Sequence, residues 1–90
     1  MADNPVVRFH NLSAYKAFVV SYLARKISEV QDEKAKALFS ELIQRTEILR
    51  TRDFYRFLTR VLEVQRQTGI NLTAIIPSEE EIQQIFQHPA

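Results

Sequence analysis

The side chains best suited to chemistry in this sequence are arginines in the stretch between residues 45 and 66. Arg52, Arg56 and Arg60 follow one another at four-residue intervals, so on a helix they form one ridge. The stretch holds six arginines and three acidic residues, and its candidate basic ridge comprises Arg45, Arg52, Arg56, Arg60 and Arg66. A guanidinium donates forked pairs of hydrogen bonds to phosphate or carboxylate groups. The ridge therefore suits a nucleic-acid backbone or an acidic protein.

A simpler interpretation of the ridge is a solvated helix face. Arg56 lies opposite the apolar stripe of its helix, where a helix in water normally carries its charges. Asp53 and Glu63 are spaced to pair with neighbouring arginines and so to weaken the positive field. We rank the solvated face first, an acidic protein partner second and nucleic acid third.

No other residues have the spacing of a catalytic or metal site. His10 and His88 stand near opposite ends, no cysteine is present, and Gly69 is the only glycine, which excludes glycine-rich nucleotide loops. The acids Glu79–Glu81 are explained by helix capping. We expect no catalytic residue, no metal ligand and no cofactor. An enzyme assembled between two subunits is a third class of function, which a polar pocket would reveal.

The composition is that of an ordinary globular domain. The 90 residues suffice for one domain, 46% of them are hydrophobic and 26% charged, and the formal net charge is +1. No run approaches the roughly 18 uncharged apolar residues that a bilayer span requires, and the first residues lack a secretory leader. We expect a cytoplasmic protein without membrane contact. Because small domains without disulfides have modest stability, we also expect an oligomer.

The first predicted helix, about residues 13–30, begins at a cap on Asn11 or Ser13. Its apolar residues cover about 200° of the helical wheel, more than a one-sided surface helix needs. This arc indicates either a position between two other helices or a dimer seam. Its excess face carries the candidate apolar anchors Val20, Tyr22 and Ile27.

The second and third helices are predicted at about residues 33–49 and 52–68. Asp32 and Thr51 are the expected caps, and Gly69 suits the left-handed residue that ends a helix. The short connection after the first helix favours an antiparallel hairpin, although no glycine or proline excludes one continuous helix.

The last part of the chain predicts an apolar connection, a proline and a short helix. Residues 70–77 are expected to lie across the open end of the bundle, and Ser78 with Glu81 forms a capping box for a helix at about 79–87. Residues 1–11 are expected to be extended or partly disordered. The prediction is a single all-α domain over residues 1–90, a small helical bundle of three main helices plus a short C-terminal helix.

The function that these patterns favour is a noncatalytic protein interaction module, a small regulatory or assembly subunit acting through exposed helix faces. Its partner is an unidentified protein, a second copy of the chain is expected to form a dimer, and no membrane is involved. Apolar anchors on the first helix and the arginine ridge would supply the contacts. The alternative is a small nucleic-acid-binding subunit that contacts the phosphate backbone through the ridge.

Overall fold

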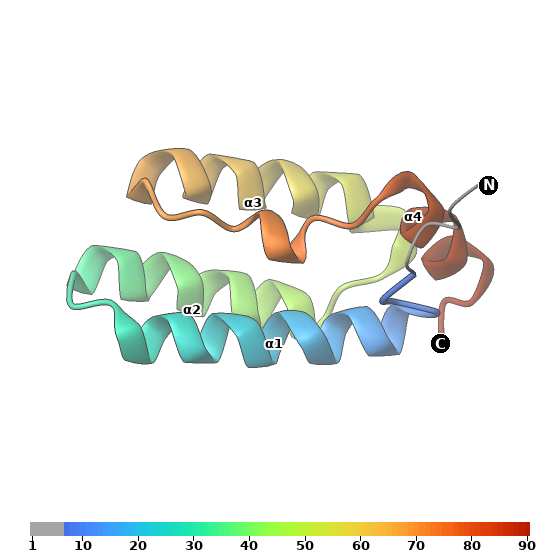
Figure 1. Ribbon diagram of the computed structural model, residues 1–90, viewed down its shortest axis with the longest axis horizontal. Helices are drawn as coiled ribbons and strands as arrows, with labels where there is room; N and C mark the ends of the chain where they lie inside the picture. The colour runs from blue at the N-terminus through green and yellow to red at the C-terminus, as the bar shows by residue number, and fades with distance from the viewer. Residues whose placement is uncertain (1–6) are drawn as a thin grey trace, which may run out of the picture.

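Four α-helices and two short 3-10 helices form the part of the chain that the computed structural model describes, residues 7–90. The elements are α1 (Leu12–Glu29), α2 (Glu33–Glu47), η1 (Thr51–Asp53), α3 (Phe54–Thr68), η2 (Thr73–Ile75) and α4 (Glu79–Gln87). The three long helices run alternately up and down (Figure 1). The predicted fold class, a compact all-α domain of three long helices and a short C-terminal one, is confirmed.

The first two helices are separate and form an antiparallel hairpin. Asn11 caps α1, its side-chain oxygen accepting a 2.7 Å hydrogen bond from the N–H of Ala14. At Val30 the backbone becomes extended, and Asp32 then caps α2 by accepting a 3.3 Å hydrogen bond from the N–H of Lys34. The chain reverses here without glycine or proline because a polar cap can restart a helix within three residues.

The connection from α2 to α3 differs from the prediction. Helix α2 ends at Glu47, and Thr51 does not cap α3 with its side chain. Thr51 instead begins η1, where its carbonyl accepts a hydrogen bond from the N–H of Phe54. A 3-10 turn therefore leads directly into α3, and no side chain caps that helix. The prediction that the Thr51 side chain caps this helix is therefore wrong, because a backbone hydrogen bond occupies that position.

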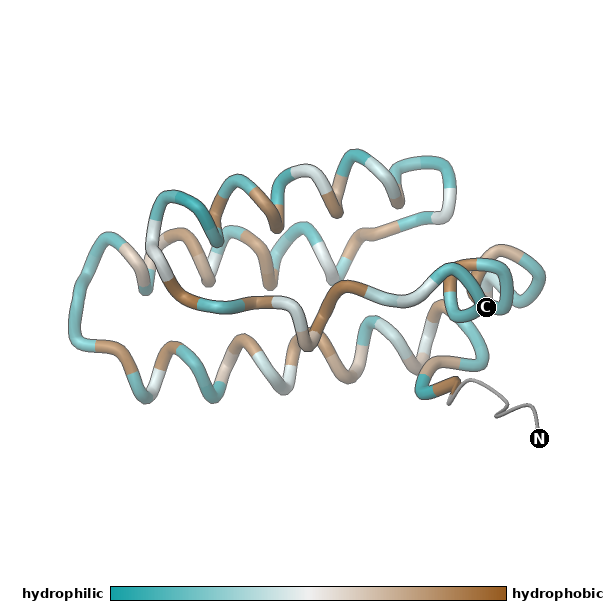
Figure 2. The backbone as a smooth tube through the Cα atoms, turned by 45° about the horizontal axis from the view of Figure 1, so that its top comes forward, coloured by the Kyte–Doolittle hydropathy of each residue, from teal (hydrophilic) through white to brown (hydrophobic). Residues whose placement is uncertain are grey.

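Residues 70–78, here called the return segment, run back along the bundle between α1 and α3 (Figure 1). Gly69 starts the reversal with a φ of 71°. The Tyr15 hydroxyl donates a 2.6 Å hydrogen bond to the carbonyl of Ile75, and the Tyr22 hydroxyl donates one of 3.4 Å to that of Asn71. The expectation that this segment lies across the end of the bundle is therefore wrong. Its apolar residues recur along the bundle axis, as Figure 2 shows, and need a lengthwise groove to be buried.

This path explains the wide apolar arc of α1. Helix α2 covers one side of that arc, and the return segment covers another. Tyr15, Val19 and Leu23 are fully buried, while Tyr22 and Ile27 pack partly buried against the same core. One chain therefore supplies both neighbours that the arc requires, and the predicted dimer seam on α1 is not needed to explain it.

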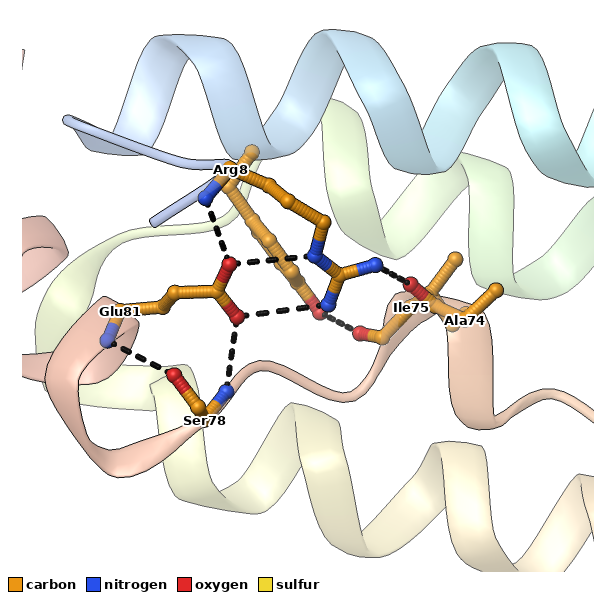
Figure 3. A network of polar contacts seen from close by, with 6 residues as sticks. Arg8, Ala74, Ile75, Ser78 and Glu81 are labelled. Atoms are coloured by element: carbon orange, nitrogen blue, oxygen red, sulfur yellow. Dashed lines mark hydrogen bonds and ion pairs between the residues drawn. The ribbon is translucent and has the colours of Figure 1, made fainter. Parts of the chain in front are cut away.

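A buried carboxylate joins the two ends of the described chain (Figure 3). The Glu81 side chain is 2% exposed and accepts four hydrogen bonds. Three come from Arg8, through its backbone N–H at 2.7 Å, its Nε at 3.1 Å and its Nη2 at 3.3 Å. The fourth comes from the N–H of Ser78 at 2.8 Å and completes the predicted capping box. This charge is buried but fully hydrogen-bonded, which is what makes its burial tolerable.

The segment before α1 is held in place by the contacts of Arg8 with Glu81 and by two further contacts. Phe9 is buried and packs edge-on against Tyr15, with the ring centroids 5.1 Å apart. The N–H of Leu12 donates a 3.0 Å hydrogen bond to the carbonyl of His88. Residues 7–11 thus form no helix and are anchored to the domain through Arg8 and Phe9, while the expectation for residues 1–6 lies outside the described residues.

The pKa of Glu81 makes the fold sensitive to acid. Burial by itself raises this pKa, but the hydrogen bonds from Arg8 and Ser78 outweigh burial and lower it from 4.5 to about 2. Because the unfolded chain takes up the proton first, the free energy of unfolding should fall by about 2–3 kcal/mol as the pH drops from about 5 to about 2. Urea unfolding across this pH range measures the loss.

The matched variant for that experiment is Glu81→Gln, which keeps a good capping-box residue but removes the titrating charge. It should lower stability at neutral pH by about 1–3 kcal/mol and reduce the acid-dependent loss. Some acid dependence should remain, because the pKa of Glu41 is also lowered to about 2. An acid-dependent loss as large in the variant as in the natural chain would contradict the assignment to Glu81.

Gly69→Ala tests the reversal that starts the return segment. An added Cβ meets no atom within 4 Å, so the cost of the substitution is backbone strain at positive φ alone. We expect a decrease in stability of about 1 kcal/mol in urea unfolding. Gly69→Asn should lose less, because asparagine tolerates the left-handed region. Equal stability of the alanine variant and the natural chain would show that the strain is relieved.

Candidate functional site

The most distinctive surface of the described chain lies where α2 ends and α3 begins. Two adjoining hollows of about 240 and 660 Å³ open there, and Ile48 and Leu49 line both. We call this the corner surface and define it by Ile48 and the charged lining residues, Lys16, Arg45, Glu47, Arg50, Arg52, Asp53 and Arg56.

Ile48 is the apolar centre of the corner surface. It follows the last residue of α2, and 78% of it is exposed, the largest value among the exposed large apolar residues of the described chain. Its neighbour Leu49 is turned inward and buried. A single exposed apolar residue is common on soluble proteins. Ile48 is unusual because it stands between two hollows ringed by charged residues.

The charges around Ile48 are mainly positive. Five cationic side chains and two acidic ones line the hollows. Within residues 7–90, Arg50 and Arg56 form no ion pair, and Arg52 lies 3.8 Å from Asp53. Lys16 reaches in from α1 and donates a 3.3 Å hydrogen bond to the carbonyl of Leu49. Several cations at this surface are therefore available to bind an anionic group.

The predicted arginine ridge is divided by Glu41. This carboxylate on α2 accepts 2.8 Å hydrogen bonds from the Nε and Nη2 of Arg60 and from the Nε of Arg45. Arg60 also binds Glu63 at 3.2 Å. The hydrogen bond from Arg60 is the main reason that the pKa of Glu41 falls to about 2, and Glu41 in turn raises the pKa of Arg60. The ion pair of Glu41 with Arg60 thus joins α2 to α3, while the pairs Glu41–Arg45 and Arg60–Glu63 lie within single helices, and two arginines of the ridge are occupied.

The structure distributes the predicted site residues over four places, one of which is the contact of Arg60 with Glu41 described above. Arg52 and Arg56 line the corner surface, Arg45 lines it while bound to Glu41, and Arg66 is exposed in the last turn of α3. The apolar anchors Val20, Tyr22 and Ile27 lie on α1, are all partly buried, and line neither hollow. Tyr22 stacks on Phe18 with the ring centroids 6.1 Å apart.

Sequence reasoning missed Ile48 and Lys16. A signal for Ile48 was present, because it is a large apolar residue that falls outside the apolar stripe of its helix. Lys16 gave no signal, since its place beside Leu49 depends on how α1 packs on α2. A second exposed apolar group, Tyr55 with Phe86, has ring centroids 5.8 Å apart and joins α3 to α4.

Comparisons with protein-family models, curated proteins and solved structures found no match to this chain. Within residues 7–90, no group of three or more His, Cys, Asp or Glu is placed to hold a metal ion. None of the helices described is long and apolar enough to cross a membrane. The chemistry that the corner surface offers is the binding of anionic and apolar groups together.

Glu41→Gln tests whether Glu41 keeps Arg45 and Arg60 from binding other anionic groups. Loss of the ion pairs should lower stability by only about 0.5–1 kcal/mol, because the pairs are partly exposed. The released Arg45 and Arg60 should hold the protein on immobilised heparin to a higher salt concentration. Glu33→Gln makes the same charge change at an exposed residue whose ion-pair partner within residues 7–90 is Lys36, at 3.3 Å. Equal elution of the two variants would show that Glu41 does not restrain the arginines.

Proposed function

We propose that this chain is a noncatalytic interaction module that binds another protein through the corner surface, as a small regulatory or assembly subunit. The observation that carries the proposal is Ile48, which is 78% exposed and lines both hollows together with five cationic and two acidic side chains. Protein interfaces commonly combine an apolar centre, which excludes water, with a polar rim in which arginine is enriched. The corner surface has both parts.

The alternative is a nucleic-acid-binding subunit that uses the arginine ridge, and the charges favour it less. Phosphates would compete with Glu41 for Arg45 and Arg60, and the lowered pKa of Glu41 keeps that carboxylate ionised at neutral pH. Neither hollow is lined by an exposed aromatic residue on which a base could stack. Tyr55 is exposed, but its ring contacts Phe54 and Phe86 instead.

A photo-crosslinking amino acid at position 47 tests the proposed function in cells that produce the protein. Glu47 is exposed and lines the larger hollow, so this substitution removes no cation from the surface. We expect protein adducts at position 47 that are lost when Ile48→Gln is added. The same crosslinker at Ser28, near the far end of α1, gives the background.

The matched control for Ile48→Gln is Leu62→Gln, the same kind of change at a half-exposed residue of α3. Both variants should keep their stability within about 0.5 kcal/mol, because surface substitutions rarely do more. Adducts that persist in Ile48→Gln, or that appear equally from position 28, would refute the proposal. Adducts to nucleic acid instead of protein would favour the alternative.

A further inference from the structure

The arrangement of charges around Ile48 suggests what kind of partner the corner surface accepts. Arg45 and Arg56 line the smaller hollow, whereas Lys16, Arg50 and Arg52 line the larger one. Ile48 and Leu49 are shared by both hollows and so lie between the two cationic groups. Across the surface the order is therefore cationic, apolar, cationic.

We infer that the corner surface binds an acidic peptide segment in which one large apolar side chain is flanked on both sides by carboxylates. This inference rests on the proposed function and specifies the partner's chemistry. The apolar side chain packs against Ile48, and the carboxylates bind Arg56 on one side and Arg50 with Arg52 on the other. Arginine suits this role because its planar fork binds a carboxylate through two parallel hydrogen bonds.

The smaller hollow is better suited to one side chain of a larger partner than to a separate small molecule, whereas the volume of the larger hollow, about 660 Å³, does not distinguish the two. The volume of the smaller hollow, about 240 Å³, lies below the roughly 300–1,000 Å³ that is typical of small-molecule pockets. A hollow of this size has room for one side chain of a larger partner. Phe57 forms part of its wall and gives that side chain an apolar contact in addition to Ile48.

The two acidic lining residues set the register of such a segment. Asp53 lines the smaller hollow and Glu47 lines the larger one, so one acidic side chain stands among the cations of each hollow. A uniformly anionic polymer would meet repulsion at both positions, whereas a peptide can place neutral residues there. Charge placement of this kind selects a partner as much as it attracts one.

A defined peptide tests the inference directly. The chain contains no cysteine, so Gln31→Cys in the turn between α1 and α2 places one fluorophore at the end of the hairpin away from the corner surface (Figure 1). The probe is a short alanine-based peptide with a central leucine and a pair of glutamates on each side. Two controls replace either the glutamates or the leucine with glutamine. We expect binding of the probe and at least about tenfold weaker binding of each control, equivalent to about 1.4 kcal/mol.

Variants of the protein assign the binding to the corner surface. Arg50→Gln with Arg56→Gln removes two cations that form no ion pair in the described chain, so the fold should persist. It should weaken the probe's binding about tenfold or more. The charge-matched control is Arg25→Gln with Lys34→Gln, two exposed residues outside both hollows and outside the arginine ridge, and it should bind like the natural chain.

The same titration distinguishes the other possible occupants. Single-stranded DNA that binds more tightly than the peptide, with affinity falling steeply between about 50 and 200 mM salt, would overturn the inference in favour of nucleic acid. If unlabelled protein, added to the labelled protein without peptide, gives a binding signal that Ile48→Gln abolishes, the inference is overturned in favour of a second copy of the chain. If the peptide does not bind while crosslinking at position 47 still captures an Ile48-dependent protein, the acidic partner is wrong and the proposed function stands.

Discussion

The described fold depends on the carboxylate of Glu81. Three segments meet at this group: the residues before α1, the return segment and the first turn of α4. Its four hydrogen bonds satisfy a charge that is almost completely removed from water. An unsatisfied carboxylate there would be costly, so the three segments are held in one arrangement. The same guanidinium that binds it also donates to the carbonyl of Ala74 at 3.0 Å and lies 4.6 Å from the ring of Phe9.

Fixing these segments has consequences for the core and for the surface. The return segment runs between α1 and α3 and adds Leu72 and Ile75 to the core (Figure 1). Helix α2 is joined to α3 by the ion pair of Glu41 with Arg60. The corner surface forms where this α2–α3 pair comes to an end, and the short 3-10 connection leaves Ile48 in solvent beside Arg50 and Arg52.

Local patterns in the sequence were sufficient to predict most of the helices. Apolar spacing, the caps at Asn11 and Asp32, the glycine at position 69 and the Ser78–Glu81 capping box are all confirmed. They could be predicted because each acts over a few residues. The path of the return segment and the pairing of Glu81 with Arg8 could not, since they join residues far apart in the chain.

The candidate site was predicted only in part for the same reason. The spacing of the arginines predicted the ridge, but tertiary packing decides which arginines Glu41 binds and where Ile48 lies.

The hydrogen bond from Tyr15 to Ile75 joins residues 60 positions apart, which has a consequence for synthesis on the ribosome. Translation at about 5–20 residues per second delivers the return segment about 3–12 s after Tyr15. During that interval the α1–α2 hairpin can form, but Tyr15 lacks the hydrogen-bond acceptor and the part of the core that the return segment supplies. The nascent chain therefore passes through a period in which Tyr15 is incompletely covered and can contact other molecules, and the arrival of the return segment ends that period.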